Sequence, residues 1–349
     1  MTLVQPTPEM QTQIRVELNE DVSTRFLTEE KWKNLDSIIN NVILMCFSDD
    51  GRIMTFLRGC KFSLEKTKRK LDMYFTMRTA VPEFFGNRDP EKDEIKEEHP
   101  PLPGLTPNGR RVIVMRGADL DGNNLPNVSD CMKVVLMIGD IRLKEEIVGV
   151  AGDVYVLDAA VATPQHFASH FSKFTPTLIK KFLICVQEAY PVKLKEVHVI
   201  NVSPLVDTII SFVRPFLKEK IRNRIHVHQD LDSLYKFVPK DVLPEEYGGY
   251  AGPIADINKQ WYQKLMDYRD WFLQQETVKA DEARRPGKPK THDDLFGFNL
   301  YINCSQYFYS FYLFYKEIYT SPMLKILFVF FVRNQINLTV METVQKRAL

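Results

Sequence analysis

The sequence predicts an α/β fold, in which an all-helical N-terminal unit precedes a domain built on a mostly parallel sheet. Four runs rich in apolar and β-branched residues indicate the strands: 111–116, 149–161, 194–202 and 225–228. Helical patterns separate these runs, and strands that alternate with helices are typical of parallel pairing with helices around the sheet. Before them, apolar residues at helical spacing run from residue 9 to about residue 48 and resume after Ser63.

Composition excludes several classes of function. The 349 residues include 46 basic and 45 acidic ones, so no global field favours nucleic acid, and membrane attraction must come from local clusters. Five scattered cysteines without a CxxC pair indicate a reduced, cytoplasmic protein. The polar, acidic start argues against a secretory signal, and no glycine-rich phosphate loop is present, so we expect no cofactor.

The helical unit is expected to occupy residues 1–81. Asp49, Asp50 and Gly51 interrupt its first helical pattern, and Ser63 caps a helix whose outer face is basic. Residues 82–109 are polar and broken by prolines, which is typical of a linker.

The α/β domain is expected over residues 110–253, with Ser129 capping a helix that runs to about Glu146. Further helices open at Pro164 and Pro176, each preceded by threonine. The rest of the chain divides by composition into a closing helix, a charged surface linker and an atypical aromatic tail: 254–278, 279–299 and 300–349. The uncharged start of the tail is compatible with a transmembrane helix, an interfacial helix or an aberrant, disordered end.

The stretch from Tyr190 to Asp230 holds the most informative pattern. Ser203 and Pro204 begin a helix after the third strand, and Pro215 is expected to kink it. Apolar residues recur along this helix at steps of three and four: Leu205, Val206, Ile209, Ile210, Val213, Phe216 and Leu217. Cations crowd its far end and the preceding strand: Lys193, Lys195, Lys218, Lys220, Arg222 and Arg224. The pattern fits either a core helix with a solvated rim or a mobile cover over an apolar cavity, flanked by a basic patch for anionic lipid.

Catalytic and metal-binding patterns are weak. His166 and His170 lie one helical turn apart, and His226 and His228 share a strand face, but spacing places no third ligand near either pair. The sequence HFASH also lacks the glutamate of the zinc-protease motif. Structural histidines are therefore expected, with no metal and no enzymatic activity; a metal-dependent hydrolase is the less favoured alternative. Cys131 and Cys185 lie in apolar helical patterns, which predicts buried thiols.

Five segments together resemble one known family. They are FLRGCKFSLEKTKRKLDMY at 56–74, PGLTPNGRRVIVMRG at 103–117, PVKLKEVHVIN at 191–201, FVRPFLKEKIRNRIHVH at 212–228 and LPEEYGG at 243–249. In this order and spacing they resemble the CRAL-TRIO family, which includes the α-tocopherol transfer protein and the cellular retinaldehyde-binding protein. The resemblance extends over roughly residues 25–299.

The resemblance implies a helical lid over an apolar cavity and a phosphoinositide headgroup site. Periodicity and resemblance together suggest the cavity lining: Tyr155, Leu157, Phe167, Phe171, Phe182, Val186, Val199, Ile209, Phe212 and Val213. The matching headgroup contacts are Lys193, Lys220 and Arg224. Cys60 stands where the family's LRxR motif has a basic residue, and Lys61 is the candidate substitute.

We therefore expect a cytoplasmic, peripherally membrane-associated carrier of a hydrophobic small molecule that unloads at phosphoinositide membranes. The alternative is a phosphoinositide-sensing regulatory module that moves no cargo. The segment VLDAAVATPQHF at 156–167 departs from the family's tocopherol and retinal patterns, so the cargo stays open.

Overall fold

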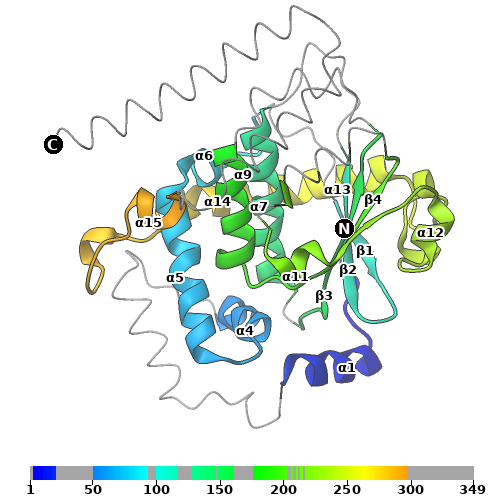
Figure 1. Cartoon of the computed structure of the whole chain (residues 1–349), viewed down its shortest axis with the longest axis horizontal. Coiled ribbons are helices and arrows are strands. Elements are labelled where there is room, and N and C mark those ends of the chain that lie inside the picture. Colours follow the sequence, from blue (N-terminus) through cyan, green and yellow to red (C-terminus); the bar gives the residue numbers. More distant parts are fainter. Residues whose placement is uncertain are drawn as a thin grey trace, which may run out of the picture.

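The computed structural model describes residues 3–20, 50–92, 100–116, 127–146, 148–160, 176–202, 206, 210, 213–214 and 217–297. Its centre is a five-stranded sheet in the order β1-β2-β3-β4-β5 (Figure 1). The strands are β1 (Pro101–Leu105), β2 (Arg110–Arg116), β3 (Gly152–Asp158), β4 (Leu194–Ile200) and β5 (Ile225–Val227). Only β1 runs antiparallel to its neighbour, and β2 to β5 are parallel. The predicted α/β fold with a mostly parallel sheet is confirmed.

Helices connect the parallel strands. The connection from β2 to β3 contains α7 (Val128–Glu145), and that from β3 to β4 contains α9 (Pro176–Ile184) and a π-helix, η1 (Cys185–Ala189). In crossovers of this kind the connecting helices pack back onto the sheet. Asn127 is the N-cap of α7, and its side chain accepts from the backbone N–H of Ser129, the residue expected to cap this helix.

The N-terminal helices are α1 (Pro8–Leu18), α4 (Asp50–Gly59), α5 (Leu64–Ala80) and α6 (Pro82–Phe85). Asp50 and Gly51, expected to interrupt the helical pattern, lie inside α4. Ser63 is the residue before α5, as expected, but its side chain makes no capping hydrogen bond. The expected linker at 82–109 contains both α6 and β1. Its prolines do not exclude β1 because that strand is at the edge of the sheet.

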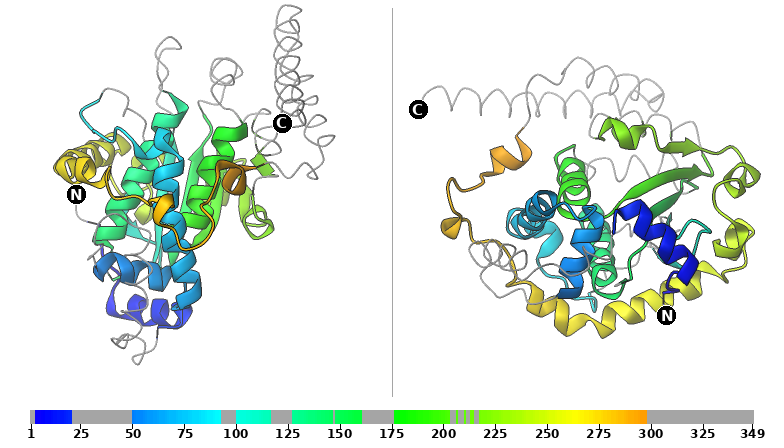
Figure 2. Two further views of the ribbon diagram at one scale, coloured as in Figure 1. Left: turned by 90° about the vertical axis from the view of Figure 1, so that its left-hand side faces the viewer. Right: turned by 90° about the horizontal axis from the view of Figure 1, so that it is seen from below.

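The chain beyond the lid region forms short elements and then long helices. The short ones are α11 (Glu219–Arg222), α12 (Leu231–Tyr235) and the 3₁₀ turns η3 (Lys240–Val242) and η4 (Glu245–Tyr247). The expected closing helix is two helices, α13 (Ile254–Asp267) and α14 (Arg269–Gln275), with a break at Tyr268. In the right-hand view of Figure 2, α13 passes along the side of the sheet away from α9.

The segment after α14 was expected to be a surface linker. Most of its described residues are exposed, but it also contains two short helical elements and contacts α5. The elements η5 (Glu282–Arg284) and α15 (His292–Phe296) lie here, and Phe296 is buried. The backbone N–H of Ala280 donates to Phe75 O of α5 at 3.1 Å. Arg285 pairs with Asp72 of α5 at 2.7 Å. Two cations of this charged segment, Arg285 and Lys290, are therefore partners of Asp72 in α5.

Among the described residues, two large apolar clusters form most of the core, and a small third cluster joins Ile14 and Leu18 of α1 to Ala151. One joins α4, α5 and α6 to one face of α7 and to η1. The other joins α7 and α13 to alternate sheet residues such as Val112, Val154 and Val156. Because strand side chains alternate between faces, the residues between them face the other way.

A buried carboxylate ties α5 to α7. Asp140 accepts hydrogen bonds from Tyr74 at 2.7 Å and Tyr190 at 2.8 Å, and it pairs with Arg78 at 2.6 Å and Arg88 at 2.7 Å. The two guanidinium groups and the two hydroxyls hold the pKa of Asp140 at about 2, although burial alone would raise it. Asp140 is therefore a fixed negative charge within the helical core.

Several expectations fall outside the described residues: Phe167, Phe171, Ile209, Phe212, His166, His170, the start of the lid helix at Ser203 and the tail at 300–349. Within the described ranges, the helices are all too short or too polar to cross a bilayer.

Candidate functional site

One face of the sheet carries a continuous apolar row. Tyr155 of β3 is in register with Ile113 of β2 and Val197 of β4, and Leu157 is in register with Val199. These residues alternate with the ones that pack toward α13. The structure thus brings together the three sheet residues expected to line a cavity, Tyr155, Leu157 and Val199. Burial raises the pKa of Tyr155, so its phenol stays neutral on this face.

The helical residues of the expected lining lie differently. Phe182 and Val186 pack against the helical core cluster. The ring of Phe182 meets Phe84 of α6 edge-on, with centroids 6.1 Å apart. Three apolar residues of the expected lid are described in helical conformation: Val206 is buried, and Ile210 and Val213 are half-buried. Phe182 of α9 thus packs on α6, and Val186 of η1 packs against the same helical core.

The headgroup candidates meet because α4 approaches the start of β4 closely. A Cβ on Gly59, the last residue of α4, would lie 2.2 Å from Pro191 O, so only glycine fits there. Lys61 and Phe62 then adopt left-handed conformations, with φ of 54° and 58°. This turn places Lys61 beside Lys193.

Lys193 is the central cation of this group. Among the described residues, no hydrogen-bond partner reaches its buried Nζ. Burial lowers the pKa of Lys193 to about 8, and the ammonium groups of Lys61 and Lys220 act in the same direction. Lys61 and Lys220, two of the expected headgroup contacts, therefore lie within electrostatic range of Lys193.

Arg224 and a further lysine extend this group along β4. Burial lowers the pKa of Lys195, and the charges of Arg224 and Lys220 lower it further. Arg224 also donates from its guanidinium to Leu194 O, which fixes its position next to the strand. We call Lys61, Lys193, Lys195, Lys220 and Arg224 the basic cluster. Its concentrated positive charge suits a multiply charged anion.

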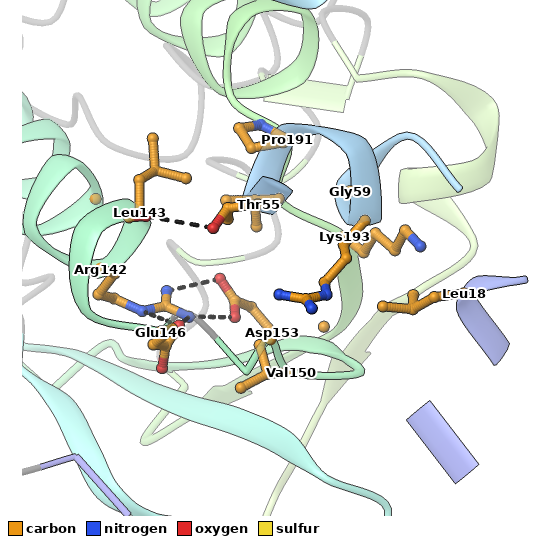
Figure 3. Close-up of a pocket in the computed structure, with 15 residues that line it drawn as sticks. Leu18, Thr55, Gly59, Arg142, Leu143, Glu146, Val150, Asp153, Pro191 and Lys193 are labelled. Atoms are coloured by element: carbon orange, nitrogen blue, oxygen red, sulfur yellow. Dashed lines mark hydrogen bonds and ion pairs between the residues drawn. The ribbon is translucent and has the colours of Figure 1, made fainter. Parts of the chain in front are cut away.

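A small cavity opens beside the basic cluster (Figure 3). Its volume is about 70 Å³, and its walls come from α1, α4, α7 and the starts of β3 and β4. The cavity is lined by Lys193 and Arg58. It is also lined by an ion pair, in which Arg142 Nη2 lies 2.8 Å from Asp153 Oδ1. The cavity is the size of a few water molecules, whereas sites for drug-sized ligands typically measure about 300–1,000 Å³.

Sequence reasoning missed Arg58 at this site, and it placed Lys195 in the basic patch but not among the headgroup contacts. Arg58 lines the cavity and pairs with Glu20, and Lys195 pairs with Glu17. Arg58 lies in the family-like segment at 56–74, so the sequence could have indicated it. The sequence could not have indicated its partner Glu20, which lies 38 residues earlier in the chain.

The histidines form a cluster that the sequence showed only in part. His198 Nδ1 and His228 Nε2 are 2.9 Å apart, and the rings of His198 and His226 stack at 5.1 Å. Phe237 covers all three rings. Within the described residues, no group of three or more possible ligands is arranged for a metal ion.

The two cysteines singled out from sequence differ in burial. Cys185 is buried, and this burial raises the pKa of its thiol. Cys131 is half-exposed on α7, so its expected burial is wrong. Its thiol contacts Asn127 O at 3.2 Å, at the start of the helix rather than in its core.

Comparisons of the sequence with known proteins agree on the family. The family model for the CRAL/TRIO domain matches residues 96–249, and a model described as "Pinta-like, UBA domain" matches residues 33–95. The alpha-tocopherol transfer protein-like protein of Homo sapiens is 30% identical over 281 residues, which cover 77% of this chain and 78% of that protein. Clavesin-2 of Rattus norvegicus is 29% identical over 269 residues, covering 75% and 80% of the two chains.

A solved structure described as "Crystal structure of Sfh5" aligns with a TM-score of 0.42 at 16% identity, covering 78% of this chain and 99% of that one. The matched domain model and the extent of the identity to full-length relatives agree with the resemblance seen in the sequence motifs. This chain belongs to the CRAL-TRIO family.

Proposed function

We propose that this protein binds a hydrophobic small molecule, tocopherol-, retinoid- or phospholipid-like, and releases it at phosphoinositide-containing membranes, where it acts as a peripheral protein of the cytoplasm. The observation that carries the proposal is the basic cluster around Lys193. The Nζ of Lys193 is buried, and the described residues offer it no acceptor. A phosphate headgroup would supply both the negative charge and the acceptors.

The apolar row on the sheet supports the cargo part of the proposal. Tyr155, Leu157 and Val199 form one wall of the proposed cavity. Burying about 400 Å² of an apolar ligand at about 25 cal/mol per Å² offers about 10 kcal/mol, which exceeds typical ordering costs. Relatives with 30% identity carry the name "Alpha-tocopherol transfer protein-like", which describes transfer of a hydrophobic molecule.

Release follows from the position of the basic cluster in the chain. Lys220 and Arg224 lie between the proposed lid, which includes Val213, and strand β5. Each cation near an anionic leaflet contributes about 1 kcal/mol. A membrane that binds these cations would therefore hold the protein with the end of the lid facing the bilayer, where the apolar side of the lid can be buried.

The double variant Lys220→Ala with Arg224→Ala tests the membrane step. Losing two cations should weaken binding to phosphatidylinositol bisphosphate vesicles by about thirtyfold and slow cargo transfer, with little change in cargo affinity. Lys236→Ala with Lys259→Ala is the matched control, because both of these lysines are exposed and lie outside the basic cluster. Equal losses of vesicle binding and cargo affinity would mean that Lys220 and Arg224 support the fold instead.

The second candidate is a phosphoinositide-responsive module that carries no cargo. The cavity beside the basic cluster, at about 70 Å³, supports it, because such a module needs room only for water or part of a headgroup and not for a lipid. Mass spectrometry of molecules extracted from the purified protein separates the two candidates. The carrier should yield a stoichiometric lipid, which Leu157→Trp should displace by filling the proposed cavity. Absence of lipid, together with vesicle binding unchanged in Leu157→Trp, would favour the module.

A further inference from the structure

The N-terminal helix α1 lies against the basic cluster. Its apolar residues Ile14 and Leu18 are buried, together with Leu3 before the helix. A Cβ on Gly109, which has a φ of +68°, would lie 2.9 Å from Ile14 Cδ1, so the β1–β2 turn and α1 are in close contact. Leu18 lines the same small cavity as Lys193 (Figure 3). The end of α1 therefore reaches the site proposed for the headgroup.

Two carboxylates at this end hold cations of that site. Glu20 accepts from Arg58 through both of its oxygens, at 3.1 and 3.2 Å, and its side chain is only 2% exposed. Glu17 pairs with Lys195, whose side chain is 16% exposed. Bidentate and partly buried ion pairs are the more stable kind, so the two contacts hold α1 in a defined position.

The paired cations flank Lys193. Arg58 lines the cavity together with Lys193, and Lys195 lies within the electrostatic reach of Lys220 and Arg224. An anion bound to this group would therefore compete with Glu17 and Glu20 for the same positive charge. Glu9, in the first turn of the same helix, is exposed, and its carboxylate interacts with Thr7.

We propose that α1 is an internal competitor of the headgroup: Glu17 and Glu20 neutralise cations of the site until a phosphoinositide surface displaces them. This inference rests on the proposed headgroup site and adds a mechanism for its regulation. Membranes without phosphoinositide have too little charge density to displace α1, so the competition sharpens the choice of membrane. Binding of the headgroup and undocking of α1 are then coupled, and each favours the other.

Vesicle binding by Glu17→Gln and by Glu9→Gln tests the competition. Both variants remove one negative charge from α1, so non-specific attraction to an anionic surface rises equally in the two. Glu17→Gln alone frees Lys195, and its affinity for phosphatidylinositol bisphosphate vesicles should exceed that of Glu9→Gln by about fourfold, or about 0.8 kcal/mol. Equal affinities of the two variants, with wild-type binding intact, would overturn the inference and leave the proposed function standing.

Hydrogen exchange of the α1 amides in the wild-type chain gives a second readout. Exchange over residues 8–18 should accelerate when phosphatidylinositol bisphosphate vesicles are added and stay unchanged with phosphatidylcholine vesicles. Wild-type binding without this acceleration would also overturn the inference. If neither the wild type nor Glu17→Gln binds the vesicles, the inference and the proposed function both fail. Binding by Glu17→Gln alone would support the competition in its strongest form.

Discussion

The depressed pKa of Lys193 predicts that headgroup binding weakens as the pH rises. With a pKa of about 8, set mainly by burial, Lys193 is about nine-tenths charged at about pH 7 and about one-tenth charged at about pH 9. A cation at an anionic surface contributes about 1 kcal/mol, which corresponds to about fivefold in affinity. Lys193→Arg keeps its charge throughout this range because the guanidinium does not titrate there. The wild type loses about four-fifths of this charge, so it should lose about fourfold more affinity than Lys193→Arg between these two pH values.

The assay is co-sedimentation with phosphatidylinositol bisphosphate vesicles at fixed ionic strength. Ionisation of the lipid phosphate also changes with pH, but it changes equally for both proteins, so their ratio isolates Lys193. Lys236→Arg provides the matched control at an exposed lysine outside the basic cluster, and it should follow the wild type. An identical pH dependence for the wild type and Lys193→Arg would refute the reasoning, because it would mean that Lys193 does not contact the headgroup.

Two further predictions concern stability. Asp140→Asn should lower the free energy of unfolding by about 3–5 kcal/mol in urea denaturation, because Arg78 and Arg88 would remain buried without their carboxylate. The matched control is Asp256→Asn at an exposed position, which should change the free energy of unfolding by less than about 0.5 kcal/mol. Burial lowers the pKa of His198 to about 4, so its imidazole binds a proton more readily in the unfolded chain than in the folded one. The free energy of unfolding should therefore be highest above about pH 6.5 and fall by about 3 kcal/mol as the pH is lowered to about 4. His198→Gln should show a smaller loss over this range, and an equal loss would contradict the assignment.

Strand and helix patterns were predictable where local periodicity decides structure. The alternation in β4 and the unbroken apolar run of β3 gave the strands and their parallel class, since both patterns arise from residues adjacent in the chain. Element boundaries were less predictable. Asp50 and Gly51 disfavour a helix locally, yet they lie in α4, whose Ile53, Phe56 and Leu57 are buried in the helical core.

Charge-rich segments were the least predictable part of the fold. The stretch after α14 has the composition of a solvated linker, but Arg285 pairs with Asp72 and donates to Thr76 across more than two hundred residues of sequence. A charged residue has the same local signature whether water or a distant partner satisfies it. Composition therefore indicates how polar a segment is, but not what it contacts.

The sequence by itself determined the family, the sheet and the two faces of its strands, because a period of two residues places Tyr155 and Leu157 on the same side. It also indicated Lys193 and Lys220, since both lie in segments with a recognisable motif. Only the tertiary structure showed that Gly59 lets α4 approach Pro191, and that Glu17 and Glu20 reach cations 178 and 38 residues further along the chain. Such contacts depend on how packed elements meet in space, and no short-range pattern records them.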